Sequence, residues 1–411
     1  MASAPDAADL PTPRRRRRRP PSALRELLRA PAGRILAGVA AALLLLTLVA
    51  LLALWPSGDT AGTSGALGGE TIAATAQRVE VVPCGPVGQD CRRVVAVVEE
   101  GPDRGDRVTL DLGPVEATQS VDAGQAIRVA KTVGAPPGTP AYGFTDVDRR
   151  MPLVWLFVAF AAMGVVIARR QGALALLGLM ASLALVTTFL VPAILEGSSP
   201  ILVSIVASLA VMFVTLGLTY GISAQSLSAA AGIGACLLFA TLLGELALSL
   251  THLEGRGGEL YPLLQQAGAG DLSLSGIVLA GMVIGALGVL TDTAVTQASA
   301  VMALRRANPA LGVGGLYHGA FAVGRDHLAA TMHTLVMAYV GTLLPLLLVL
   351  EAADVGVTDA LNGQFLAEPA VATLVGSMAL MASVPLTTIL ASLLAVRVPV
   401  TAIPAGHAHA H

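Results

Sequence analysis

Residues 281–299 read Gly281-Met-Val-Ile-Gly-Ala-Leu-Gly-Val-Leu-Thr-Asp-Thr-Ala-Val-Thr-Gln-Ala-Ser299. The stretch is apolar over most of its length, as expected of a helix that crosses a membrane. Its small and polar residues recur every three or four positions, an interval that places them on one face of a helix. They are Gly281, Gly285, Gly288, Asp292, Thr296 and Ser299. The stretch therefore predicts a membrane-spanning helix with one polar face.

The polar face predicts a contact with another helix. Gly281, Gly285 and Gly288 form a glycine seam, and small residues let neighbouring helices approach closely. Asp292 then places a carboxylate inside the span, at a cost of about 2.5–3.5 kcal/mol on insertion scales. If the span ends near Met302, Asp292 lies ~15 Å inside it, near the middle of the membrane. A carboxylate at this depth needs a partner or a function.

A second apolar stretch provides partners for Asp292. The following span is expected to begin near Arg325, and His333 lies ~12 Å from Arg325, at a depth comparable with that of Asp292. An acid and an imidazole at this depth are typical of proton relays. We therefore expect an ion or substrate site from Asp292, Thr296, Gln297, His333 and Thr334. The alternative is a helix–helix hydrogen bond, in which Asp292 only fixes the packing of two helices.

The whole chain has the composition of a membrane protein. It has 411 residues, of which 55% are hydrophobic and 13% charged, and its mean hydropathy is +0.74. These values lie far from the balance of a soluble domain. Eight apolar segments predict an α-helical polytopic membrane protein with about eight transmembrane helices. The segments are 35–55, 153–168, 172–195, 200–219, 226–250, 274–302, 328–350 and 369–396.

The arginines predict the orientation in the membrane. The run Arg14 to Arg19 precedes the first span. When eight spans are counted, Arg169, Arg305 and Arg397 all fall on the same side of the membrane as this run. Because cytoplasmic loops carry the excess of Lys and Arg, both termini are expected in the cytoplasm of a plasma membrane. The arginine run is expected to bind membrane lipid and no nucleic acid.

Five segments follow from this organisation. We expect a disordered basic arm over 1–34, a first transmembrane helix over 35–55, and an extracytoplasmic β-rich domain over 56–150, between the first and second spans. A seven-helix membrane domain over 151–397 and a cytoplasmic tail over 398–411 complete the chain.

The β-rich domain carries two of the three cysteines. Short β-rich runs separated by turn residues predict a small antiparallel barrel or sandwich. Cys84 and Cys91 lie seven residues apart in this domain, where disulfides form outside the cytoplasm, so we expect them to be bridged. Cys236 lies in an apolar helix and is expected to be a core residue.

Other polar groups have structural alternatives. Arg325 and Asp326 stand at the expected start of the seventh span, where the pair either caps the helix or serves function. Glu245, Ser249 and His252 share a face at the outer end of the fifth span, where they hydrate easily.

Motifs for chemistry are missing from the sequence. It contains no metal-binding H-E-x-x-H pattern, no phosphate-binding loop and no G-x-S-x-G element. We expect no metal, no cofactor and no enzymatic activity.

Four quoted pieces of sequence are similar to a known family. They are Gly285 to Ser299, Asn308-Pro309, Gly324-Arg-Asp-His-Leu328 and Thr331-Met-His-Thr-Leu-Val-Met-Ala-Tyr-Val-Gly341. Together they resemble the YibE/F family of bacterial multispan membrane proteins, over about residues 75–396. The resemblance implies that Asp292, the Gly324-Arg325-Asp326 group and Thr334-Leu335 are family positions. Relatives commonly carry asparagine where this chain has His333, which favours Asp292 as the main site residue.

Two functions are compatible with these observations. The first is a secondary-transporter-like or permease-like protein for an unknown small solute or ion, with a polar site between spans six and seven. The alternative is a non-transporting scaffold or subunit whose outer domain binds an envelope protein partner.

Overall fold

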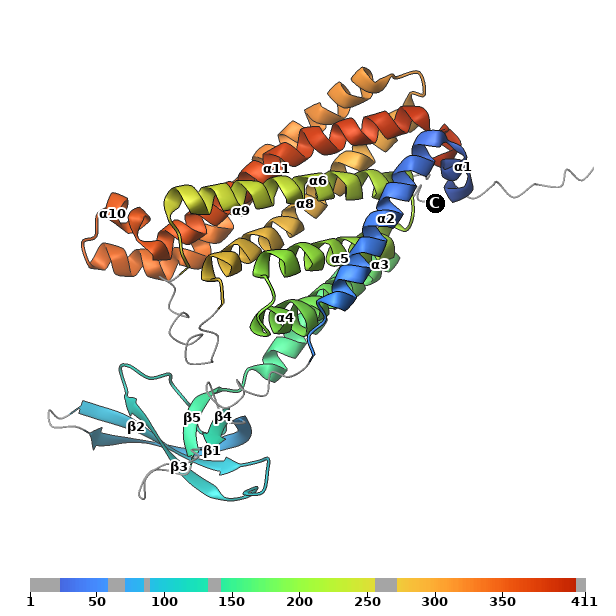
Figure 1. Cartoon of the computed structure of the whole chain (residues 1–411). Helices are drawn as coiled ribbons and strands as arrows, with labels where there is room; N and C mark the ends of the chain where they lie inside the picture. The colour runs from blue at the N-terminus through green and yellow to red at the C-terminus, as the bar shows by residue number, and fades with distance from the viewer. Residues whose placement is uncertain (1–22, 58–70, 85–88, 132–141, 256–271, 404–411) are drawn as a thin grey trace, which may run out of the picture.

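The computed structural model of the chain consists of a bundle of long helices and a small β-sheet (Figure 1). It describes residues 23–57, 71–84, 89–131, 142–255 and 272–403. The predicted arm over 1–34 and tail over 398–411 lie partly outside these residues. The sheet is joined to the bundle through α2 (Pro31–Ala53) and α3 (Arg150–Leu185), the helices before and after it in the chain.

The sheet has five antiparallel strands in the order β3-β2-β1-β4-β5. Its two edge strands lie close to each other, so the sheet curls. The register shifts at three places along the strands, and such irregularities increase the local twist. The strands are β1 (Thr71–Cys84), β2 (Gln89–Val98), β3 (Arg107–Pro114), β4 (Ala126–Lys131) and β5 (Tyr142–Val147).

The sheet has a hydrophobic core of its own. Val94, Leu110, Ile127 and Val129 are buried in it with their neighbours. Alternate residues of a strand point to opposite faces, which is why runs such as Val94-Val-Ala-Val-Val98 bury every second side chain. The disulfide between Cys84 and Cys91 joins the end of β1 to the start of β2. The predicted β-rich region is therefore a compact unit of its own.

Seven helices of the described chain are long and apolar enough to cross a membrane. The longest, Arg150–Leu195, combines α3, the π-helical turn η1 (Val186–Leu190) and α4 (Val191–Leu195). The remaining helices are α1 (Ala23–Arg29), α5 (Pro200–Tyr220), α6 (Ala224–Thr251), α8 (Leu274–Ala307), α9 (Val313–Ala352), α10 (Val357–Asn362) and α11 (Gln364–Arg397), followed by the 3-10 turn η2 (Val400–Ala402).

The longest helix reverses direction at Arg169. This residue has φ 49° and ψ −127°, outside the helical region. A Cβ added to Gly172 would collide with the carbonyl oxygen of Gly164, although eight residues of straight helix span ~12 Å. The chain therefore folds back into two apolar arms. The sequence prediction of eight spans counts these arms, 153–168 and 172–195, separately.

The π-helical turn supports a contact with the first long helix. Phe189 is fully buried in η1, and its ring stacks on Trp55 with 5.7 Å between ring centroids. Two residues beyond Trp55, the backbone amide of Ser57 donates to the Glu196 carboxylate at 2.9 Å. These contacts fix the connection that leads from α2 toward the sheet.

Helices α6, α8 and α11 form the centre of the bundle. They approach closely at glycines: a Cβ added to Gly232 of α6 would collide with the hydroxyl group of Thr387 on α11, and one added to Gly244 would lie 2.5 Å from a methyl group of Leu279 on α8. The predicted glycine seam is different. A Cβ on Gly281 or Gly288 would meet no atom within 4 Å, because α8 buries its other faces.

Candidate functional site

Asp292 and His327 form an acid–imidazole pair between α8 and α9. The distance between Asp292 Oδ2 and His327 Nε2 is 3.6 Å. The side chain of Asp292 is 67% exposed and that of His327 is 36% exposed, so the pair lies on the outer surface of the bundle. The charge of Asp292 also acts on the phenol group of Tyr220, the last residue of α5. Three helices therefore contribute to the surroundings of the carboxylate.

The register of α8 against α9 explains why His327 faces Asp292. Helix α8 ends at Ala307 and α9 begins at Val313, so Asp292 and His327 lie 15 and 14 residues from the same turn. The predicted partner, His333, was chosen because the span was expected to begin near Arg325. Helix α9 begins at Val313, so that start is wrong by about three helical turns. His333 is exposed, and it makes no hydrogen bond or ion pair with any described residue.

Asp292 also lies away from the middle of the neighbouring helix α5. The first turns of α5 and α8 lie side by side, since a Cβ on Gly276 of α8 would lie 3.4 Å from the ring of Pro200 of α5. Asp292 follows Gly276 by 16 residues, or ~24 Å, whereas α5 runs ~30 Å from Pro200 to Tyr220. The carboxylate therefore lies toward the Tyr220 end rather than at the predicted midpoint.

Thr331 orients the imidazole group of His327. Its hydroxyl group lies 3.4 Å from His327 Nε2 and donates a 2.9 Å hydrogen bond to the carbonyl oxygen of His327. The two residues are four apart on α9, where such pairs are neighbours on the helix surface. Thr334, another predicted site residue, is exposed and donates to the carbonyl oxygen of Ala330 at 3.0 Å. It does not contact Asp292.

Gln297 belongs to the interior rather than to the exposed pair. Five residues after Asp292, it points ~140° away around the helix. Its Oε1 accepts a 2.9 Å hydrogen bond from the Thr388 hydroxyl group on α11, while its Nε2 is buried without a hydrogen-bond partner. A Cβ on Gly324 would lie 2.5 Å from that nitrogen. Gly324 thus lets α9 lie directly on Gln297, and Thr296 is half-buried beside it.

A row of buried hydroxyl groups on α11 was missed by the sequence analysis. All its members face the centre of the bundle: Ser377, Ser383, Thr387, Thr388 and Ser392. Among the described residues, the hydroxyl groups of Ser377, Thr387 and Ser392 find no hydrogen-bond partner. The same helical periodicity that identified the Asp292 face would have found this row. Helix α8 therefore contributes to two polar regions, one exposed at Asp292 and one buried at Gln297.

Arg325 and Asp326 do not start a helix. Helix α9 begins at Val313, twelve residues before Arg325, so the predicted capping role is wrong. Both side chains are exposed, and neither forms an ion pair within the described residues. They place two further charges next to His327.

A separate polar cavity of about 420 Å³ lies where α6 ends and α8 begins. Glu245, Ser249 and His252, predicted to share a face, line it together with Ser273 and Ser275. Within the described ranges, no three His, Cys, Asp or Glu side chains are grouped so that they could hold a metal ion.

Long apolar helices, a central helical core and ionisable groups on two adjacent helices define a multi-pass membrane protein with an additional small sheet. The model of the family described as YibE/F-like protein matches residues 156–397. The chain belongs to the YibE/F-like family, and the match covers the helices from α3 to α11. Searches of curated proteins and of solved structures find no match to this chain.

Proposed function

We propose that this protein is a permease-like protein of a bacterial plasma membrane, in which Asp292 and His327 bind a proton or a small cation. The observation that carries the proposal is the 3.6 Å approach of the carboxylate and the imidazole on two adjacent apolar helices. Ionisable groups in such helices are rare and mark pathways for ions and substrates. The cargo would be a small solute or ion.

The pair can respond to protonation. With a proton on His327, the pair is an ion pair that attracts α9 to α8. When the imidazole loses the proton, the attraction weakens, while the charge of Asp292 still acts on Tyr220. Protonation therefore changes the force between two helices, as a proton-coupled transporter requires.

Helix α9 is suited to movement. Its buried residues are Leu316, Ala320 and Gly324, all in its first half. In the second half, Tyr339 brings its hydroxyl group to 3.8 Å from a Cβ built on Gly285. Helix α9 also packs along α11, so the movement we propose is a rocking of α9 against α8 about the Gly324 contact, as in alternating access.

The arrangement of the termini supports a common cytoplasmic side. Pro31 at the start of α2 and Arg397 at the end of α11 line the same groove, so the two ends of the membrane helices lie together. Arg169 lies at the reversal between the two arms of the helix Arg150–Leu195. Arginines in such connections are most common on the cytoplasmic side of a membrane. Both observations support our proposal that the sheet is extracytoplasmic.

Access of water to position 292 tests the proposal. In a Cys236→Ala background, which keeps the Cys84–Cys91 disulfide, Asp292→Cys is treated with a membrane-impermeant maleimide from either side. Leu238→Cys on α6 is the matched control, because Leu238 is 61% exposed on an apolar surface. We expect labelling of position 292 from one side and none of position 238. Equal absence of labelling would mean that the pair faces lipid and only packs helices.

The sheet favours a second candidate function. It has its own core and disulfide, and it lies beside the bundle instead of covering it (Figure 1). This arrangement suits a scaffold whose sheet binds an envelope protein. Deletion of residues 70–140 should then release a co-purifying partner while the helices remain folded, whereas a permease would purify without that partner.

A further inference from the structure

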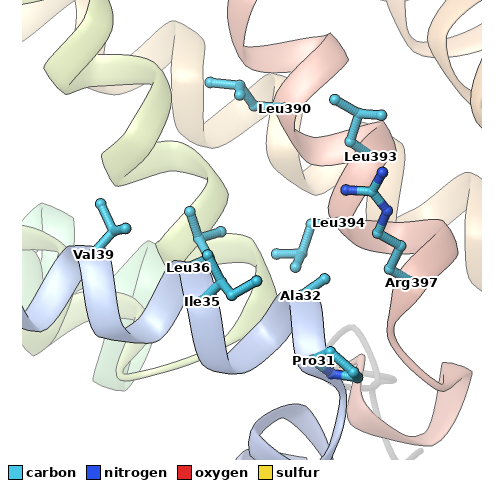
Figure 2. Close-up of a pocket in the computed structure, with 9 residues that line it drawn as sticks. All are labelled: Pro31, Ala32, Ile35, Leu36, Val39, Leu390, Leu393, Leu394 and Arg397. Atoms are coloured by element: carbon cyan, nitrogen blue, oxygen red, sulfur yellow. The ribbon is translucent and has the colours of Figure 1, made fainter.

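An apolar groove lies on the outside of the bundle between α2 and α11 (Figure 2). Its volume is about 400 Å³. Eight of its lining residues are apolar and one is charged: Pro31, Ala32, Ile35, Leu36, Val39, Leu390, Leu393, Leu394 and Arg397. The two helices that form it are both long enough to cross a membrane. The apolar walls are therefore expected to face the hydrocarbon of a bilayer.

The charged residue lies at one end of the groove. Arg397 is the last residue of α11, and its guanidinium group lies beside Leu393 (Figure 2). Neither Arg397 nor Arg34, one turn into α2, forms an ion pair in the part of the chain that the structure describes. The sequence has no acidic residue over 27–55 or over 386–403, and Glu26 of α1 is the one carboxylate close by in sequence. Since Arg25, Arg29, Arg34 and Arg397 outnumber it, this end of the bundle is basic.

We propose that this groove binds an anionic phospholipid. One acyl chain would lie along Leu36, Val39 and Leu390, and the headgroup phosphate would meet the guanidinium group of Arg397. Guanidinium groups recognise phosphate through paired hydrogen bonds, and anionic lipids concentrate near arginines at the end of membrane helices. The position of Arg397 at a helix end matches the depth of a headgroup.

The charge of the groove argues for a lipid rather than a second copy of the chain. In a symmetric dimer the same surface meets itself, so the Arg397 side chains of both copies would be brought together, and no acidic residue lines the groove to separate them. A phospholipid instead supplies the negative charge and the apolar chain at once.

Thermal unfolding of the full chain with added lipid tests the proposal. Delipidated protein in neutral detergent is titrated with phosphatidylglycerol or with phosphatidylcholine. We expect phosphatidylglycerol to stabilise the protein at lower concentration, and Arg397→Gln to weaken its binding about fivefold, equivalent to ~1 kcal/mol. Val39→Trp, at an exposed position that lines the groove, should weaken binding of both lipids. Arg170→Gln, an exposed arginine on α3, is the matched control and should bind like the parent.

Three outcomes would overturn the proposal. Equal losses for Arg397→Gln and Arg170→Gln would mean that lipid senses only the net charge. Competition by inorganic phosphate, with no effect of Val39→Trp, would mean that the site takes a free anion. A change from dimer to monomer in Val39→Trp, without a change in lipid binding, would identify a second copy as the occupant.

Discussion

Helices α9 and α11 are nearly equal in hydropathy, yet they occupy different environments. In the most apolar stretch of α11, 56% of the residues are buried inside the protein, whereas none is buried in that of α9. Most buried residues of α11 are alanine, serine or threonine. Helix α9 exposes large side chains such as Val340, Leu344 and Leu348. Side-chain size, rather than hydropathy, therefore distinguishes the helix at the centre from the helix at the edge.

The difference follows from the solvent of a membrane protein. Lipid tails are as apolar as leucine, so moving a large apolar side chain from lipid into protein yields little free energy. Close contact and interhelical hydrogen bonds remain as the forces that hold helices together. Both favour small residues and hydroxyl groups, and α11 carries them.

The largest effect is expected from removing a buried leucine of α11. Leu380→Ala empties a fully buried position and should lower the free energy of unfolding by about 2–5 kcal/mol. Leu348→Ala on α9, where the side chain is 62% exposed, should change it little. Unfolding by denaturant in mixed micelles gives both values. Similar losses in both variants would mean that α9 is also packed, through a contact with another chain.

Adding one methyl group at a helix crossing should have the next largest effect. Gly232→Ala forces Thr387 of α11 to move, at a cost of about 1–3 kcal/mol. Gly341→Ala on α9 adds a methyl group where no atom lies within 4 Å and should be neutral or slightly stabilising. Melting temperatures in one detergent compare the two, and a stable Gly232→Ala protein would contradict the close approach of α6 and α11.

Removing an interhelical hydroxyl group should have a smaller effect. Thr388→Val deprives Gln297 of its hydrogen bond and should cost about 0.6–1.7 kcal/mol, the range found for such bonds in membranes. Thr334→Val removes a hydroxyl group that bonds only within α9 and should cost less. The melting temperatures of the single variants and of Thr388→Val with Gln297→Leu provide the test. Independent, additive effects of Thr388 and Gln297 would argue against their hydrogen bond.

The smallest effect is expected in the sheet, away from both helices. Lys131, at 2.7 Å, and the Tyr142 hydroxyl group donate to Asp103 and hold the pKa of its carboxyl group below the ordinary value. Because the folded pKa is depressed, the ionised group stabilises the sheet above the ordinary aspartate pKa, and this contribution is lost as the pH falls through the folded value. Asp103→Asn should remove that part of the acid sensitivity.

Hydrogen exchange of β4 and β5, corrected for intrinsic rates, measures this sensitivity. Glu116→Gln, in the exposed turn after β3, is the control and should retain the acid response of the parent. An unchanged acid response in Asp103→Asn would assign it to other carboxylates. A response that extended to α9 or α11 would show that sheet and bundle unfold together.

The sequence predicted the class of the protein because hydropathy depends on composition alone. The apolar segments, the β-rich insertion and the family were recognised from local patterns. The periodicity of α8 identified its polar face correctly, but it could not tell whether that face meets a helix. Lipid and protein interior select the same apolar residues, which is why the glycine seam at Gly281 and Gly288 was expected to pack.

The site was only partly predictable, because pairing between helices depends on where each helix begins. Asp292 was identified because a carboxylate inside an apolar span has a high free energy of insertion into the membrane. To identify its partner, the position where α9 begins must be known. Residues 313–324 contain enough glycine and polar residues that hydropathy does not show the helix beginning there. An error of about three turns exchanged His327 for His333. Gln297 was assigned to the same site, but it follows Asp292 by five residues, so its side chain points toward α11 instead.

The π-helical turn at Val186–Leu190 makes the arrangement of the first helices depend on a residue count. A turn of this kind holds one residue more than an α-helical turn, and the amide of Val191 accordingly bonds to the carbonyl oxygen of Val186. Loss of any one residue there would restore the α-helix and rotate everything beyond it by ~100°. Phe189 and Glu196 would then no longer both meet Trp55 and Ser57. This part of the chain can therefore vary in side chains but not in length.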